Sequence, residues 1–161
     1  MRRRTVLRIL GAGACGLASG AGGRAAGNAR PEVRIFRSLE EAVPVAGTPV
    51  LLVFFSTGCP SCFDDLFEAR LLVERGGWPM AVTGVFADPE EELRSFLEKY
   101  GWTRPAVLDR RKVLFRKHRV EAVPFKVLLI GGRTAYRDDP RTVYGERLEA
   151  LRTCLERTFS R

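Results

Sequence analysis

The chain has 161 residues, which is enough for one domain with a buried core. Hydrophobic residues make up 45% of it and charged residues 29%, a balance that is ordinary for a globular protein and indicates no particular function. The net charge is +8, but the first 25 residues hold five arginines and no acid, so the charge without them is +3. The basic character therefore belongs largely to the N-terminal segment, and we expect no nucleic-acid role.

Residues 1–29 have the features of an export signal. Arginines at positions 2–4 are followed by a short apolar stretch over residues 9–21 and then by small residues that suit cleavage. This stretch is shorter than the roughly 20 residues that a membrane-spanning helix needs. The Arg3-Arg4 pair resembles a twin-arginine signal, and a general secretory signal is the alternative. We therefore expect the signal to be removed and the protein to be periplasmic or otherwise extracytoplasmic.

The four cysteines divide into one close pair and two isolated residues. Cys15 lies within the signal, where a lipid anchor is a minority alternative. Cys59 and Cys62 form the close pair, and Cys154 is distant from it. One short-spaced pair and a leftover cysteine do not make a structural disulfide framework, so we expect chemistry at the pair. We expect Cys154 to be a small buried apolar side chain, with a third redox cysteine as the alternative.

The first half of the domain predicts alternating strands and helices. Residues 33–36 predict a short strand, and a helical turn follows it. The nearly continuous apolar run at residues 49–55 is typical of a central strand that is covered on both faces. Residues 62–75 have helical periodicity and end at a Gly-Gly pair, and residues 80–86 predict the next strand.

The clearest helix signals lie between residues 88 and 101. Asp88 is a good N-cap, Pro89 suits the first helical position, and Glu91 has a spacing like that of a capping box. Apolar residues then recur at helical spacing as far as Gly101, which supplies the stop. The sequence therefore predicts a helix that is capped by Asp88.

The rest of the chain predicts a short strand, a basic helical turn, a hairpin and a final helix, at residues 105–108, 111–119, 125–130, 134–137 and 145–159. His118 lies in the basic turn, and we expect it on a solvated face. Alternating strands and helices indicate an α/β fold with helices layered around a mixed sheet. We expect one domain over residues 30–161.

The Cys59-Pro60-Ser61-Cys62 motif lies directly after a predicted strand and begins a predicted helix, the context in which a C-x-x-C pair is informative. Unpaired N–H groups at the helix start favour a thiolate at Cys59. Pro60 suits the first turn because its missing N–H has no helical partner to lose. We expect Cys59 to attack a substrate disulfide as the nucleophile and Cys62 to resolve the mixed disulfide. A zinc site needs four ligands, and only one cysteine and one histidine remain to complete it.

Residues 54–62, read together with Val123-Pro124, resemble the thioredoxin superfamily. More narrowly they resemble its exported TlpA-like branch, whose members include reductants that serve cytochrome c maturation. The segment at residues 105–109 is similar to the strand-helix insertion of that branch. The resemblance covers residues 32–158 and implies a three-layer thioredoxin-like fold, with a mixed central sheet flanked by helices.

The resemblance also implies a substrate-binding loop. The Val123–Pro124 peptide bond is then expected to be cis, and its loop is expected to lie beside the cysteines and pair with substrate backbone. Pro60 and Ser61 are expected to contact substrate as well. A trans proline at the start of the next strand is the alternative that the residues alone favour.

Two positions depart from the thioredoxin pattern. Gly58 stands where thioredoxins commonly carry Trp, and Val53 stands where they carry a buried acid. TlpA-like chains often have Glu three residues after the second cysteine, and this chain has Asp65 there. We hypothesise that Asp65 handles protons for the cysteine pair, and the alternative is a solvated acid in the first helical turn.

The resemblance implies an exported protein-disulfide oxidoreductase that acts as a reductant on other exported proteins, as a monomer and without cofactor or metal. An upstream electron donor or acceptor, which can be membrane-bound, would restore its redox state. One alternative is a thiol peroxidase of the peroxiredoxin type, because Ser56 and Cys59 loosely match its S-x-x-C motif. Against this, Leu52 stands where that family expects Pro. A copper- or zinc-binding assembly protein is a further alternative.

Overall fold

The computed structural model describes residues 32–43 and 45–159. The predicted export signal and Cys15 lie outside the described residues. The helices and strands are, in chain order, β1 (Ile35–Phe36), α1 (Leu39–Ala42), β2 (Val50–Phe54), α2 (Pro60–Gly76), β3 (Ala81–Phe86), α3 (Glu90–Lys99), β4 (Ala106–Leu108), α4 (Val113–Lys117), β5 (Phe125–Ile130), β6 (Arg133–Arg137) and α5 (Tyr144–Phe159).

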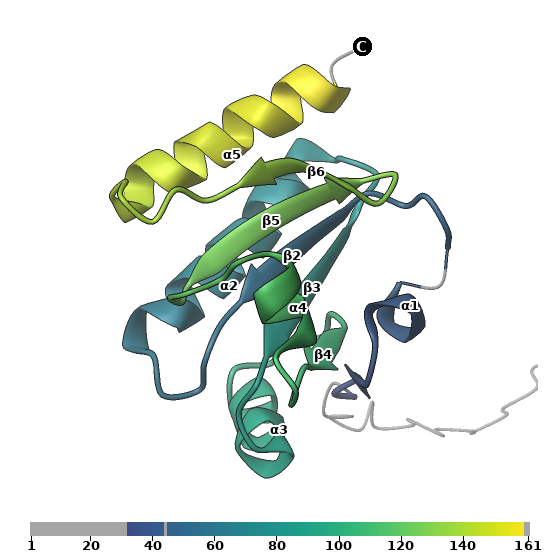
Figure 1. The fold of residues 1–161 in the computed structure, drawn as a ribbon, viewed down its shortest axis with the longest axis vertical. Coiled ribbons are helices and arrows are strands. Elements are labelled where there is room, and N and C mark those ends of the chain that lie inside the picture. Colours follow the sequence, from purple (N-terminus) through teal and green to yellow (C-terminus); the bar gives the residue numbers. More distant parts are fainter. Residues whose placement is uncertain (1–31, 44, 160–161) are drawn as a thin grey trace, which may run out of the picture.

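The strands form one mixed sheet in the order β1-β4-β3-β2-β5-β6 (Figure 1). The first four strands of this order are parallel to one another, and β5 and β6 are antiparallel to their neighbours. Parallel neighbouring strands need a crossover connection. Helix α2 supplies it between β2 and β3, and α3 supplies it between β3 and β4. The antiparallel hairpin turns instead at Gly131 and Gly132, which have φ values of 55° and 76° that side chains with a Cβ rarely adopt.

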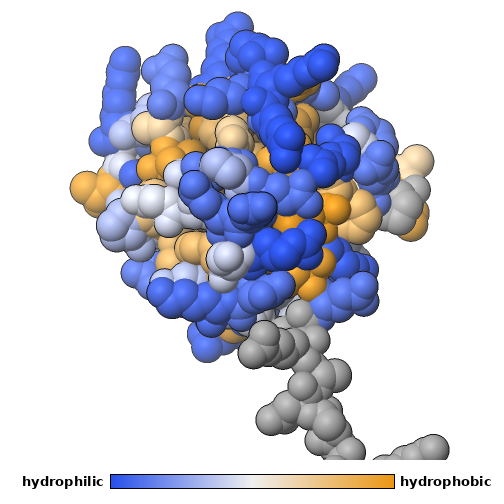
Figure 2. Space-filling model, turned by 90° about the horizontal axis from the view of Figure 1, so that it is seen from below, coloured by the Kyte–Doolittle hydropathy of each residue, from blue (hydrophilic) through white to orange (hydrophobic). Residues whose placement is uncertain are grey.

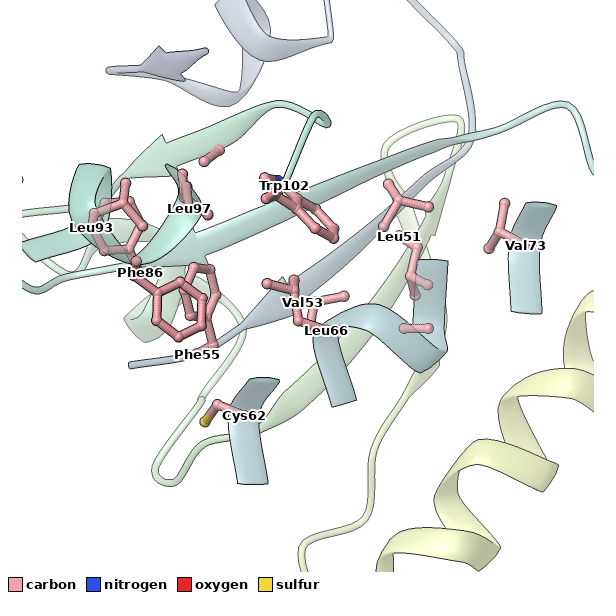
Figure 3. Packing of buried hydrophobic residues seen from close by; sticks show 14 of the residues in the cluster. Leu51, Val53, Phe55, Cys62, Leu66, Val73, Phe86, Leu93, Leu97 and Trp102 are labelled. Carbon is pink, nitrogen blue, oxygen red and sulfur yellow. The ribbon is translucent and has the colours of Figure 1, made fainter. Parts of the chain in front are cut away.

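Helices cover both faces of the sheet. On one face, α2, α3 and α5 bury Leu66, Leu97 and Leu151 against alternate residues of the central strands. Figure 3 shows Leu66 and Leu97 of this cluster near Val53 of β2 and Phe86 of β3. On the other face, α1 and α4 pack Ala42 and Phe115 over a second apolar cluster. All five residues of β2 are buried, as expected for a strand covered on both sides. The predicted three-layer α/β fold is confirmed.

On the face that Figure 2 shows, hydrophilic side chains cover much of the surface and apolar areas lie between them. Among the helices that the structure describes, none is both long enough and apolar enough to cross a membrane.

The predicted cap of α3 is wrong. The helix begins at Glu90, and Pro89, with a ψ of 141°, lies outside it as the N-cap residue. Asp88 does not cap the helix because its carboxylate binds the loop after β2. It accepts hydrogen bonds from the Ser56 hydroxyl at 2.9 Å and from the Thr57 backbone N–H at 3.1 Å.

Candidate redox site

Cys59 and Cys62 lie at the start of α2 and are joined by a disulfide, with their Cα atoms 5.3 Å apart. Cys59 is the N-cap residue and has an extended backbone, whereas Pro60 opens the helix. The Cys62 side chain is fully buried, and Cys59 is partly exposed. One sulfur is therefore accessible to a partner while the other is shielded behind it, as the assignment of nucleophile and resolving cysteine requires.

The loop before Cys59 is anchored to the end of the neighbouring strand. Ser56 and Thr57 follow β2, and both bind the carboxylate of Asp88, which follows β3. The two strands are adjacent and parallel, so the residues after them meet at one edge of the sheet. Sequence reasoning assigned Asp88 to a helix cap and therefore missed this role. Its position two residues after a predicted strand was the available signal.

The Val123–Pro124 loop lies beside the exposed cysteine. Its peptide bond is cis, which is the isomer that the resemblance implies. The Sγ atom of Cys59 lies 3.9 Å from the carbonyl oxygen of Val123 and 3.6 Å from the Ser61 hydroxyl. The Pro124 carbonyl accepts a hydrogen bond from Arg147 of α5 at 3.3 Å. The structure thus places Ser61 and the loop residues around one sulfur.

A cavity of about 270 Å³ opens next to this loop. Its lining includes Ser56 and Asp88 from the anchored loop, Phe115 from α4, and Val123 from the cis peptide. Clefts that combine apolar walls with a few polar groups are typical binding sites. A substrate segment lying there would be in contact with the cis-proline loop.

Behind the cysteines lies a cluster of three buried charges: Asp65, Lys126 and Asp138. Their exposed fractions are 0%, 0% and 1%. The Lys126 ammonium donates to both carboxylate oxygens of Asp65, at 2.8 and 2.9 Å, and it lies 3.0 Å from Asp138. A charge taken out of water is tolerated only with such partners. The alternative of Asp65 as a solvated acid is therefore wrong.

Helical geometry explains why Asp65 is buried. The buried residues of α2 recur three to four positions apart, and Asp65 falls on that face together with Cys62, Leu66 and Ala69. Residues three apart on a helix are neighbours, with about 5–6 Å between their Cβ atoms. Asp65 is therefore positioned next to Cys62 along the buried face of α2.

The two carboxylates of the cluster have different surroundings. Burial raises the pKa of Asp65 above its ordinary value of 3.8, and this effect outweighs the opposing influence of Lys126. Asp138 also adds to the rise. The Asp138 carboxylate itself accepts from the Lys126 backbone N–H at 2.8 Å and from the Tyr136 hydroxyl at 2.7 Å. The raised pKa makes Asp65 a candidate to take up a proton.

Lys126 lies on β5 opposite Val53, the position at which thioredoxins carry a buried acid. Directly opposed residues of antiparallel strands point to the same face, so Lys126 reaches the space below α2. Sequence reasoning missed Lys126 and Asp138. Lys126 could have been identified because it is the one charged residue in the otherwise apolar strand Phe125–Ile130.

The first turn of α5 covers this cluster. The Lys126 ammonium lies 5.6 Å from the centroid of the Tyr144 ring. The Tyr144 hydroxyl donates to the carboxylate of Glu68 on α2. Burial raises the pKa of Tyr144, and the hydrogen bond to Glu68 contributes. Tyr144 therefore stays protonated and can donate to Glu68.

Two residues considered from the sequence lie apart from the sulfur pair. Cys154 is a free, half-buried cysteine on α5 whose Sγ lies 3.8 Å from the Ala135 carbonyl of β6. His118 is half-buried rather than on a fully solvated face, and its ring lies 6.0 Å from that of Phe54. In the described part of the chain, no group of three or more His, Cys, Asp or Glu residues could hold a metal ion.

Known structures share this arrangement of sheet and helices. StoA from Bacillus subtilis matches with a TM-score of 0.56 and 19% identity, over 70% of this chain and 85% of its own. The chain has a thioredoxin-like fold. A thioredoxin-like protein from Aeropyrum pernix matches with a TM-score of 0.57 and 21% identity, over 70% of this chain and 79% of its own.

A third thioredoxin-like match is a secreted Mycobacterium tuberculosis disulfide oxidoreductase described as homologous to Escherichia coli DsbE. Its TM-score is 0.56 and its identity 17%, over 71% of this chain and 84% of its own. No family model matches the sequence, and no curated protein matches it. At these identities the likeness establishes the thioredoxin-like fold.

Proposed function

We propose that this thioredoxin-like chain is an exported thiol-disulfide oxidoreductase that exchanges disulfides with other extracytoplasmic proteins as a reductant. The observation that carries the proposal is the Cys59–Cys62 disulfide at the start of α2, with the Cys59 sulfur beside the cis Val123–Pro124 bond. A purely structural disulfide would not need one partly exposed sulfur beside a cis-proline loop.

The exchange uses the two sulfurs in turn. The Cys59 thiolate attacks one sulfur of a substrate disulfide, that S–S bond breaks, and the released substrate thiolate takes up a proton. Cys62 then loses its proton and attacks Cys59 Sγ, which breaks the mixed disulfide and releases the second substrate sulfur as a thiolate that takes up a proton. The substrate has gained two electrons and two protons, and the protein is left with the Cys59–Cys62 disulfide.

Asp65 is our candidate for the group that takes the proton from Cys62. Cys62 is buried and has no direct exchange with water, so its proton needs a nearby acceptor. Asp65 lies on the same buried face of α2, and its raised pKa brings its proton affinity closer to that of a thiol. Lys126 stabilises the ionised carboxylate between transfers.

Substrate recognition is assigned to the groups around Cys59. Pro60 and Ser61 are exposed at the start of α2, and the Val123 carbonyl lies next to the sulfur. An extended segment of the substrate can pair its backbone with this loop as an added strand. The cavity between Ser56 and Val123 would receive the adjoining side chain.

The remaining elements of the proposal come from the sequence. The N-terminal arginines and the small apolar stretch favour export. The resemblance to the TlpA-like branch favours a reductant of the kind that serves cytochrome c maturation, and an upstream donor that restores the dithiol. The proposed unit is the monomer.

Trapping of the mixed disulfide tests the proposal. Cys62→Ser in a Cys154→Ser background should accumulate covalent adducts with exported proteins, because the resolving step is blocked while Cys59 still attacks. Adducts are measured by non-reducing electrophoresis and identified by mass spectrometry. The matched control replaces Cys59 as well, and it should form none. Equal adduct levels in both variants, or none in either, would exclude disulfide exchange through Cys59.

A further inference from the structure

A second cavity, of about 260 Å³, lies at the end of α4 and against β5 and β6. We call it the His118 pocket, and its lining residues are Lys117, His118, Arg119, Val127, Thr134 and Arg137. Val127 belongs to the apolar cluster under α1 and α4, whereas its neighbour Lys126 points to α2. Since successive residues of a strand face opposite sides, this pocket lies across the sheet from the Asp65 cluster.

The lining of the His118 pocket is cationic and has no acidic member. Lys117, Arg119 and Arg137 contribute three positive charges. Across residues 32–43 and 45–159, none of the three forms an ion pair with a carboxylate. Like charges gathered in one cavity repel each other, and a bound anion removes that repulsion.

His118 supplies a polar atom that lacks a partner. Its Nε2 is buried and makes no hydrogen bond within the described part of the protein, while its ring lies against Phe54. Burial lowers the pKa of His118 below its ordinary value of 6.5, and the charges of Lys117 and Arg137 lower it further. The imidazole is therefore neutral near pH 7 and close to both cations. A buried nitrogen left without a partner is unfavourable unless a ligand or water binds it.

Arg137 is held in place before any ligand arrives. Its guanidinium donates to the Arg119 carbonyl at 3.3 Å and lies 5.3 Å from the centroid of the Phe125 ring. A fixed guanidinium loses less freedom on binding an anion than a mobile side chain does. The Thr134 hydroxyl adds a neutral donor from the same strand.

We propose that the His118 pocket binds a tetrahedral oxyanion of the phosphate class, either free or as the phosphate of an anionic lipid headgroup. Arginine and lysine are the usual ligands of such groups, and the pocket holds three of them with no competing acid. His118 belongs to the same lining, so its ring would sense the charge of an oxyanion bound there. This site is separate from the disulfide and is independent of the proposed redox activity.

The single histidine of the chain makes the test direct, because His118 alone gives imidazole signals in NMR spectra of the untagged protein. Inorganic phosphate is added at pH 7 and constant ionic strength, with chloride as the balancing anion. We expect a saturable shift of the His118 signals. A second titration uses sulfate, whose charge does not change around neutral pH. Compared with chloride, sulfate should raise the pH midpoint of the His118 imidazole, because a nearby anion favours the charged ring.

The variant Lys117→Gln/Arg137→Gln should weaken phosphate binding by about tenfold or more, since charge-assisted hydrogen bonds are the strong ones. Arg133→Gln removes an exposed charge from the same strand outside the pocket and should leave binding unchanged. Unsaturable shifts in the wild type, or equal weakening in the control, would refute the site. All three proteins should keep their disulfide reductase activity.

Vesicles distinguish the two sources of the oxyanion. Co-sedimentation is compared for phosphatidylcholine vesicles with and without phosphatidylglycerol. Binding that requires phosphatidylglycerol and is lost in Lys117→Gln/Arg137→Gln supports a lipid headgroup. Binding of inorganic phosphate without vesicle binding supports a soluble anion, and the absence of both overturns the proposal.

Discussion

Lys126 is a buried lysine that pairs with two carboxylates near the cysteine pair. Lys126 has no exposed surface and contacts the carboxylates of two different elements, Asp65 on α2 and Asp138 after β6. Lys126 therefore links α2, the helix with the cysteines, to the end of the hairpin that β5 and β6 form. One positive charge between two carboxylates leaves a net negative charge in the interior, which favours uptake of a proton.

Asp65→Asn should slow the resolving step by about 100-fold at pH 7, near the lower end of what a general base contributes. In the wild type this step should also slow as the pH falls through the raised pKa of Asp65, because the protonated carboxyl cannot accept a proton. The variant should lose that pH dependence. Stopped-flow release of a thiol from a preformed mixed disulfide measures both effects, with exposed Asp64→Asn as the control. An unchanged pH profile would exclude Asp65 from proton transfer.

Lys126→Met should lower the free energy of unfolding at pH 7 by about 3–5 kcal/mol, because it leaves two buried carboxylates without their cation. Removing Lys126 also removes an influence that lowers the pKa of Asp65, so this pKa should rise further. Below this raised pKa the folded variant holds a proton on Asp65 that the unfolded chain, with its ordinary pKa of 3.8, has released, so the destabilisation should shrink as the pH falls from 8 to 5. Urea denaturation at pH 5 and pH 8 measures the difference. Exposed Lys99→Met is the control, and a loss that is equal at both pH values would contradict this electrostatic account.

At the scale of the elements, loops are attached to the sheet by single aspartates. Asp88 after β3 binds the loop that precedes Cys59. Asp109 after β4 accepts from the backbone N–H groups of the first turn of α4, at 2.7, 2.8 and 3.1 Å. Both side chains accept from backbone N–H groups that would otherwise lack partners. Both lie at the C-terminal ends of the parallel strands, the end at which the cysteines follow β2.

Asp109→Ala should lower the free energy of unfolding by about 1–2 kcal/mol, the range of a lost helix cap. The short helix α4 has no other side-chain cap, and Phe115 lines the cavity next to Val123. Chemical denaturation measures the loss, and hydrogen exchange at residues 113–117 should increase locally. Exposed Asp139→Ala is a comparison that should have a smaller effect, and protected amides in α4 of the Asp109 variant would contradict the assignment.

At the scale of the whole molecule, the two faces of the sheet carry different chemistry. The face under α2, α3 and α5 holds Cys62 and the buried charges. The His118 pocket lies on the opposite face, which α1 and α4 cover. The central strands separate the two, so substitutions on one face should act independently of those on the other.

Export of the whole chain is predicted to depend on the arginine pair near its start. Arg3→Lys/Arg4→Lys should retain the precursor in the cytoplasm if the twin-arginine pathway is used, because its receptor reads both arginines. Fractionation and immunoblotting measure the distribution, and Arg8→Lys is the control. Export that is unaffected by the double change would assign the protein to the general secretory pathway instead.

Most of the element order could be predicted from the sequence because it depends on local patterns. The apolar run of β2, the helical periodicity of α3 and the Gly-Gly turn of the hairpin are each visible over a few residues. The cysteine pair was also local, since a C-x-x-C motif between a strand and a helix carries its own context. Element boundaries were less accurate: α2 begins at Pro60 and takes in the cysteine motif from its first turn.

The order of strands and helices predicts the fold class, and the spacing of Cys59 and Cys62 predicts that both sulfurs lie on one helical turn. Which polar groups are buried together follows from tertiary packing. Asp65, Lys126 and Asp138 are separated by up to 73 positions, and their contact depends on packing of α2 against β5 and on the return of the chain after β6. The same reason applies to Asp88, which binds the loop after β2, and to His118, which lies in one pocket with residues of β5 and β6. Local sequence patterns predict helices and strands, whereas the charges around a side chain depend on which distant residues pack against it in the fold.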